Sequence, residues 1–284
     1  MVALFQNSVI LNLRTGSRKG VFFLNYWHLY DEILAEIPDN VYIDDYAVGV
    51  PWTFVRTGDF AGVAMTIRSD TRPHIRDASF VGCSLREAAG CVMSWNGHEA
   101  SIATAAINAW INRPKNIAAL RGFHDEDEHA ETLAERRKFE AFALYKERIR
   151  GKKVAVVGHF PNFEKEWSPI CDLSILEQNP RDGDYPAEAA EYIIPRQDFV
   201  FMTGAAFTNK TMPRLLELSR NAVTVIVGPS VPMHPCLFAY GADALSGFTV
   251  TEPALAADLV HRSSWQGISP CGKMADLLPP GTRL

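Results

Sequence analysis

From Gly151 onward, short apolar runs alternate with stretches that have a helical pattern, and this alternation most restricts the folds open to the chain. The runs are rich in β-branched residues. Continuous apolar strands separated by helices are typical of a parallel sheet that is covered on both faces. Because crossovers between parallel strands are right-handed, the sequence predicts a doubly wound, Rossmann-like sheet. The predicted strands are Val154–Gly158, Leu173–Leu176, Phe199–Thr203, Val223–Gly228 and Ala244–Val250, and the predicted helices are Pro186–Ile194, Pro213–Arg220 and Pro253–Arg262.

The chain before residue 120 has a different pattern, which predicts a small α+β unit. Apolar residues at four-residue steps indicate a helix over Trp27–Ile37, and a third helix is expected over Glu99–Asn112. Three strand-like runs lie between them, and a capping box at Ser84–Glu87 opens a second helix. We therefore divide the chain into an N-terminal extension (1–26), an α+β domain (27–120), a connecting helix (121–150) and a Rossmann-like domain with a C-terminal tail (151–284).

Charge and cysteine content narrow the classes of function. The 284 residues include 28 Lys and Arg against 33 Asp and Glu, for a formal net charge of −5. Duplex nucleic-acid binders usually carry a basic surface, so we expect no nucleic-acid partner. No run approaches the ~18 apolar residues of a membrane span, and no signal-peptide pattern is visible, so we expect no membrane partner. Five cysteines without a C-x-x-C pair favour free thiols in a reducing cytoplasm.

The predicted topology places a site at the carboxyl ends of the strands. In a doubly wound sheet, ligands bind outside those ends, near the point where the strand order reverses. The loops after the first four strands contain His159, Glu177, Thr203-Gly204 and Pro229-Ser230. We expect these loops to gather at one edge of the sheet and to face the first domain. If a reaction takes place there, His159 is the candidate general base, held by Glu177 or by Asp182.

A metal site at the same edge is a further hypothesis. His159, Glu177, His234 and Cys236 all follow strands of the sheet, so the four residues fall on its carboxyl edge. Together they offer the mixed nitrogen, oxygen and sulfur donors that suit zinc and other transition metals. The cofactor that these residues predict is therefore a transition-metal ion. Cys171 is a poorer ligand candidate because it precedes its strand.

A nucleotide-type cofactor is the alternative. Glu177 follows Gly158 by 19 residues, near the ~20-residue offset of an acidic ribose ligand in a Rossmann unit. The glycine loop, however, carries Phe160 at the second Gly position, and Pro161 has no N–H for a pyrophosphate. S-adenosylmethionine therefore fits slightly better than NAD. This alternative makes the protein a transferase or an oxidoreductase, and a simple metal-delivery protein is a third hypothesis.

The second domain resembles the heavy-metal chelation family through four motifs in combination. The motifs are VAVVGHFP at Val154–Pro161, EQNPRDGD at Glu177–Asp184, TGAAFTNKT at Thr203–Thr211 and GPSVP at Gly228–Pro232. The first domain is similar to that family's amino-terminal partner through GVPWT at Gly49–Thr53, AMT at Ala64–Thr66 and AAINA at Ala105–Ala109. The likeness covers about residues 27–262.

The resemblance implies an enolase-amino-terminal-like first domain packed on the Rossmann-like domain, with a ligand site in the cleft between them. We expect a cytoplasmic protein that binds a small polar or metal-associated ligand there. A homodimer is expected because C2 dimers are the commonest soluble oligomers. Beside His159 and Glu177, the predicted ligand-binding residues are Trp52, Thr53, Asn108, Pro161, Asn162, Asn179, Asp184, Thr203, Gly204, Asn209, Thr211, Pro229 and Ser230.

Overall fold

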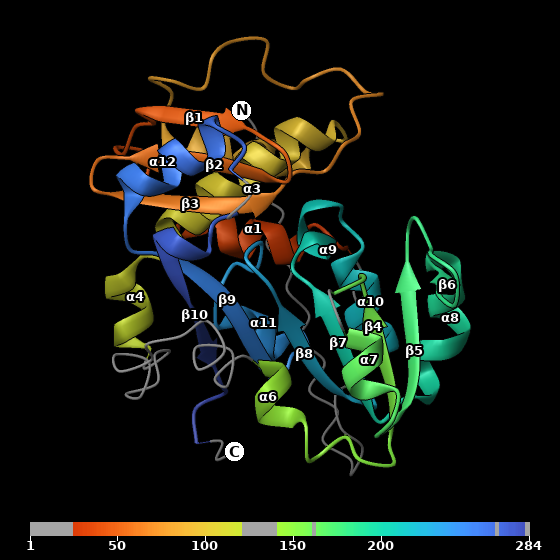
Figure 1. Cartoon of the computed structure of the whole chain (residues 1–284). Helices are drawn as coiled ribbons and strands as arrows, with labels where there is room; N and C mark the ends of the chain where they lie inside the picture. Colours follow the sequence, from red (N-terminus) through yellow and green to blue (C-terminus); the bar gives the residue numbers. More distant parts are fainter. Residues whose placement is uncertain (1–24, 121–140, 161–162, 265–266, 282–284) are drawn as a thin grey trace.

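The computed structural model describes residues 25–120, 141–160, 163–264 and 267–281, which form two units, each built on its own sheet (Figure 1). The smaller sheet has the antiparallel order β1-β2-β3. The larger sheet has seven strands in the order β10-β9-β8-β7-β4-β5-β6, all parallel to their neighbours except β10. The predicted fold class, a Rossmann-like parallel sheet with a smaller α+β unit, is confirmed.

In the first unit, the small sheet packs against a buried central helix. Its elements are α1 (His28–Ala35), β1 (Asp45–Val48), β2 (Trp52–Thr57), β3 (Phe60–Met65), α2 (Leu85–Gly90), η1 (Cys91–Met93), α3 (Gly97–Ile111) and α4 (Pro114–Ala119). Ser84 and Asn96 cap α2 and α3, because their side chains accept the main-chain N–H of Glu87 and Glu99. Gly62 lets α3 lie directly on β3, since a Cβ there would come within 2.1 Å of the nitrogen of Ala109.

The second unit carries helices on both faces of its sheet. Its strands are β4 (Lys153–Val157), β5 (Asp172–Glu177), β6 (Tyr185–Pro186), β7 (Phe199–Thr203), β8 (Val223–Val227), β9 (Ala244–Val250) and β10 (Gly272–Leu277). Its helical segments are α6 (Ala141–Tyr145), α7 (Phe163–Trp167), η4 (Ala187–Ala189), α8 (Ala190–Ile193), η5 (Ile194–Arg196), α9 (Ala205–Thr208), α10 (Met212–Leu218), α11 (Cys236–Ala239), α12 (Pro253–His261) and η6 (Ser269–Cys271). The predicted helix over Pro186–Ile194 is in fact three short helical pieces.

The strand order reverses at β4, which has β5 on one side and β7 on the other. The carboxyl ends of β4 and β7 approach each other closely there. Gly158 follows β4 with a φ of +98°, and a Cβ on it would lie 3.1 Å from the Cβ of Thr203 at the end of β7. A glycine is required because this φ and this close approach are both unfavourable for other residues. The reversal is the position at which Rossmann-like sheets bind ligands.

The two units share one core. One continuous cluster of buried apolar residues includes Ile107 of α3 and Phe207 of α9. The Tyr30 ring packs on Phe207 with a centroid separation of 4.6 Å, and its hydroxyl donates to the Phe207 carbonyl at 2.9 Å. Helix α12, late in the chain, packs against β1 and β2 of the first unit (Figure 1). The first unit is therefore completed by residues from both ends of the described chain.

Some predicted features fall outside the described residues. The predicted N-terminal extension lies there through residue 24, and the predicted connecting helix lies there through residue 140. Its remaining part contains α6, which packs beside β9. None of the helices in the described ranges combines the length and the apolar character that a membrane span requires.

Candidate functional site

Three titratable side chains converge at the carboxyl ends of β4 and β5. His159 follows β4, Asp184 ends the loop between β5 and β6, and Glu164 lies in the first turn of α7. Nδ1 of His159 is 3.0 Å from Oδ2 of Asp184, and its Nε2 is 3.1 Å from Oε1 of Glu164. The three residues offer ligand atoms that all lie within 4.8 Å of one another. One imidazole is thus held between two carboxylates.

The two carboxylates differ in their access to solvent. The side chain of Asp184 is 2% exposed and that of His159 is 8% exposed, whereas Glu164 is 44% exposed. The buried Asp184 carboxylate also accepts the N–H of Arg181 at 2.9 Å, which closes the loop around it. Gly183 permits this turn with a φ of +93°. The cluster is therefore fixed on its Asp184 side and open on its Glu164 side.

Glu177 supports the cluster through the main chain. Its Oε2 accepts the N–H of His159 at 2.9 Å, and its Oε1 accepts the N–H groups of Gln178 at 2.8 Å and Asn179 at 3.3 Å. The carboxylate therefore ties the end of β5 to the loop after β4. In this arrangement it orients the backbone that carries His159, and its side chain is not among the three clustered groups.

A second set of predicted residues lies where the two units meet. The Oγ of Ser230 accepts the N–H of Met65 at 2.7 Å. Asn108 on α3 donates to the carbonyls of Val63 at 2.9 Å and of Pro229 at 3.2 Å. Its Oδ1 is buried and has no hydrogen-bond partner in the described part of the chain. The loops after β7 and β8 also touch, since a Cβ on Gly204 would lie 2.5 Å from the nitrogen of Val231.

The remaining predicted ligand-binding residues lie in separate places. Thr203 accepts the N–H of Ala205 through its Oγ1 at 3.2 Å. Oδ1 of Asn209 accepts the N–H and the hydroxyl of Thr211, which forms a local turn after α9. Thr53 is buried with its Oγ1 2.8 Å from that of Thr66 in the small sheet, and Trp52 packs near the end of α12. Pro161 and Asn162 lie outside the described residues.

His234 lies just before α11, and Cys236 is the first residue of that helix, which packs against α1. Nδ1 of His234 accepts the N–H of Cys236 at 3.2 Å. Burial raises the pKa of the Cys236 thiol to about 12, and burial lowers the pKa of His234 against the opposing charges of Glu36 and Glu32. Within the described ranges, the metal-competent group comprises His159, Glu164 and Asp184. The structure therefore does not bring the four predicted metal ligands together.

The sequence analysis did not single out Glu164, which joins the cluster, or Lys210, which contacts the first unit. Glu164 lies in α7, a five-residue helix that was not predicted, and its spacing of five from His159 was the available signal. Lys210 stands between Asn209 and Thr211, both of which were singled out. Its Nζ donates to the Ser94 carbonyl and lies 5.4 Å from the centroid of the Trp95 ring. Burial lowers the pKa of Lys210 to about 8, although the charge of Glu99 opposes this shift.

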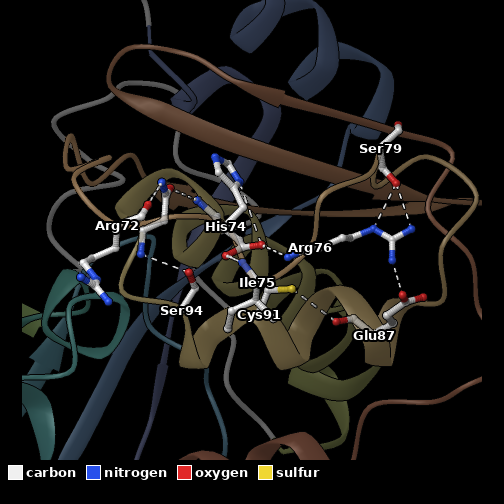
Figure 2. Close-up of polar contacts among 10 residues, drawn as sticks. Arg72, His74, Ile75, Arg76, Ser79, Glu87, Cys91 and Ser94 are labelled. Atoms are coloured by element: carbon white, nitrogen blue, oxygen red, sulfur yellow. Dashed lines mark hydrogen bonds and ion pairs between the residues drawn. The ribbon is translucent and has the colours of Figure 1, made fainter.

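A hydrogen-bond network fixes the segment that carries Ser94 (Figure 2). The buried Glu99 carboxylate accepts the N–H groups of Ile75 and Arg76, each at 2.8 Å. Asn96 donates to the Arg72 carbonyl at 2.9 Å, and its own N–H is accepted by the Ser94 hydroxyl at 3.1 Å. These hydrogen bonds hold the segment Arg72–Arg76 against the start of α3, which packs beside α9.

A mostly parallel Rossmann-like sheet packed against a smaller α+β unit defines a mixed α/β protein, and the cluster at the strand ends is its candidate site. Two family models, both described as "Putative heavy-metal chelation", match residues 30–111 and 140–266. The chain belongs to this family.

The solved structures of relatives agree with this assignment. A family protein of unknown function from Desulfitobacterium hafniense is 38% identical, with a TM-score of 0.79 over 91% of this chain and 100% of that one. A second, from Pyrococcus horikoshii, is 20% identical with a TM-score of 0.70 over 89% and 99%, which shows the fold alone. An uncharacterized protein of Methanocaldococcus jannaschii is 27% identical over 78% of this chain and 81% of its own length.

Proposed function

We propose that the protein binds a transition-metal ion, alone or carried by a small polar ligand, at His159 and Glu164. The observation that supports this most directly is the convergence of His159, Glu164 and Asp184 from three separate elements. Imidazole and carboxylate donors together suit zinc and its neighbours among the transition metals. The family description points to the same chemistry.

The unequal burial of the two carboxylates assigns a role to each. One imidazole cannot direct both ring nitrogens at one ion, so one nitrogen binds the ion and the other is held by a protein partner. Asp184 is the buried partner, which accepts the Nδ1–H of His159 and fixes the ring orientation. Nε2 and the exposed Glu164 carboxylate then form the metal-binding pair. Two protein donors leave coordination positions that a chelating ligand can fill.

Glu177 contributes by orientation in this proposal. Its hydrogen bond to the His159 N–H holds the backbone from which the imidazole projects. The alternative of a ribose ligand on Glu177 has less support, because its carboxylate already accepts three main-chain N–H groups. The catalytic role predicted for His159, that of a general base, would use the same Nε2 atom that the ion occupies.

Isothermal titration of the untagged full chain with Zn²⁺ and Ni²⁺ tests the proposal. We expect one equivalent to bind, and we expect His159→Ala to abolish this binding. Asp184→Asn should weaken it by about 10- to 100-fold, the usual effect of losing the partner of a ligating histidine.

Two control variants separate this site from other histidines. His261 is also paired with a carboxylate, Asp45 at 3.2 Å, but it lies on α12. His261→Ala should leave the titration unchanged, and so should the His234→Ala/Cys236→Ala double variant. Wild-type protein that binds neither ion, or a loss as large in the His261 variant as in His159→Ala, would contradict the proposal.

A further inference from the structure

Helix α7 carries one of the two metal donors, but it is too short to be stable alone. It comprises five residues, Phe163–Trp167, and isolated helices of fewer than about 12 residues are marginal in water. Tertiary contacts must therefore fix its position. In its first turn the Glu164 carboxylate is 44% exposed and lies 3.1 Å from Nε2 of His159. At its last residue the Trp167 side chain is only 2% exposed, so the buried indole anchors the helix that bears the donor.

Four aromatic rings form one cluster around Phe142 of α6. The centroid of the Phe142 ring lies 5.5 Å from that of Trp167, at an interplanar angle of 88°, and 4.9 Å from that of Phe160, at 70°. Phe201 of β7 completes the cluster, 4.9 Å from Trp167 and 5.5 Å from Phe142. Both contacts of Trp167 are edge-to-face, a geometry that is stabilising beyond the burial of apolar area.

This aromatic cluster joins the two segments that carry the metal donors. Phe160 directly follows His159 in the sequence, and Trp167 lies one helical turn after Glu164 on α7. The Phe142 ring contacts both Phe160 and Trp167. Because one ring touches both segments, its position affects the distance between the His159 imidazole and the Glu164 carboxylate.

The separation of the two donors suits a small ion. Nε2 of His159 and Oε1 of Glu164 lie 3.1 Å apart. With bonds of about 2.1 Å to nitrogen and oxygen, as zinc makes, an ion bound to both atoms would hold them at an angle of about 95°. That angle lies between the octahedral and the tetrahedral values. A larger ion such as Cd²⁺ makes longer bonds, so the same separation would close the angle below the octahedral value.

We propose that Phe142 and Trp167 are positioning residues, whose packing sets the donor separation and makes the site selective for small first-row ions over larger ones such as Cd²⁺. This inference rests on the proposed metal site. The two rings act through the loop that carries His159 and the helix that carries Glu164. Selectivity among metal ions depends on geometry as well as on donor type. A donor pair that is no longer held can open, which costs a small ion more than a large one.

Separate isothermal titrations of the untagged full chain with Zn²⁺ and with Cd²⁺ test the inference. We expect Phe142→Leu to lower the Zn²⁺ affinity by about 10- to 100-fold, the range for groups that orient a metal ligand, and to lower the Cd²⁺ affinity less. The ratio of the two affinities should therefore fall. A variant that is merely less folded would keep this ratio, because a smaller competent fraction lowers both affinities equally. Trp167→Phe keeps an aromatic ring with a shorter reach and should lower the Zn²⁺ affinity by about tenfold.

Tyr145→Leu is the matched control. Tyr145 also lies on α6 and is 2% exposed. Its ring packs against Phe199 at 6.2 Å and Phe201 at 5.8 Å, and neither of these residues belongs to a segment that carries a metal donor. We expect Tyr145→Leu to lower the stability in urea unfolding, because a buried ring is lost, and to leave both metal affinities unchanged.

The possible outcomes separate this inference from the proposed function. If the wild type binds Zn²⁺ but both ring variants keep its affinity and the affinity ratio, this inference alone is overturned. Equal losses in Tyr145→Leu, or a wild type that binds Cd²⁺ as tightly as Zn²⁺, would also overturn it. A wild type that binds neither Zn²⁺ nor Ni²⁺ would overturn the proposed function as well. If Phe142→Leu does not fold, Trp167→Phe decides.

Discussion

The side chain of Asn112 makes three hydrogen bonds between the first unit and the second. It caps the end of α3 and is 2% exposed. Its Nδ2 donates to the carbonyls of Val231 at 2.8 Å and Phe248 at 3.2 Å, and its Oδ1 accepts the N–H of Met233 at 2.8 Å. One side chain of the first unit thus pairs with three main-chain groups of the second.

Replacement of Asn112 by alanine leaves those three groups without this partner in a place that water does not reach. An unpaired buried polar group costs about 1 to 3 kcal/mol. We take the low end, about 1 kcal/mol for each group, because a carbonyl oxygen can keep a second partner. The expected loss in the free energy of unfolding is therefore about 3 kcal/mol.

Asn116→Ala is the matched control for this substitution. Asn116 also donates through Nδ2 to two main-chain carbonyls, those of Trp110 at 3.0 Å and Ile111 at 3.2 Å. Both acceptors belong to the first unit, and Asn116 is only half-buried, so water can replace its contacts. We expect this control to lose about 1 kcal/mol or less.

Urea unfolding of the full chain, followed by tryptophan fluorescence, measures the loss in the free energy of unfolding for each variant. The loss is obtained from the shift in the transition midpoint, provided that the denaturant dependence (m-value) is unchanged. Because the units share one core, wild-type protein should unfold in a single transition. A loss below about 1 kcal/mol for Asn112→Ala, or losses that are equal in the two variants, would show that the joint between the units does not depend on these bonds.

Two further predictions concern the segment beside α9. Glu99→Ala should lower the free energy of unfolding by about 2 to 4 kcal/mol, because the N–H groups of Ile75 and Arg76 lose a buried, charged acceptor. Glu87→Ala, which removes an exposed ion pair with Arg76, should cost less than about 1 kcal/mol. Equal losses of the two variants in urea unfolding would contradict this prediction. Between pH 8 and pH 10 the wild type should become more stable relative to Lys210→Met, because the pKa of Lys210 is lower in the folded protein, so the unfolded chain binds more protons there. A difference in stability that stays constant across that range would be the contrary result.

The local spacing of apolar residues in the sequence was enough to predict the main helices and strands of both units. The five predicted strands correspond to β4, β5, β7, β8 and β9, because strands covered on both faces must be continuously apolar. The edge strands were missed for the converse reason. Strand β10 contains Lys273 and Asp276 within its apolar run, and β6 is only two residues long. The short helices α7 and α9 leave no periodic signal, so Glu164 was not placed beside His159.

By itself, the sequence predicted a candidate site at the carboxyl edge of the parallel sheet, because the loops that follow strands joined by right-handed crossovers gather at one edge. Only the tertiary structure decided which side chains meet there. His159 meets Asp184 and Glu164 rather than His234 or Cys236, and Lys210 meets Ser94, because such contacts depend on how distant elements pack. Hydrophobic periodicity records which face of an element is buried, but it carries no information about which polar group lies on the element opposite.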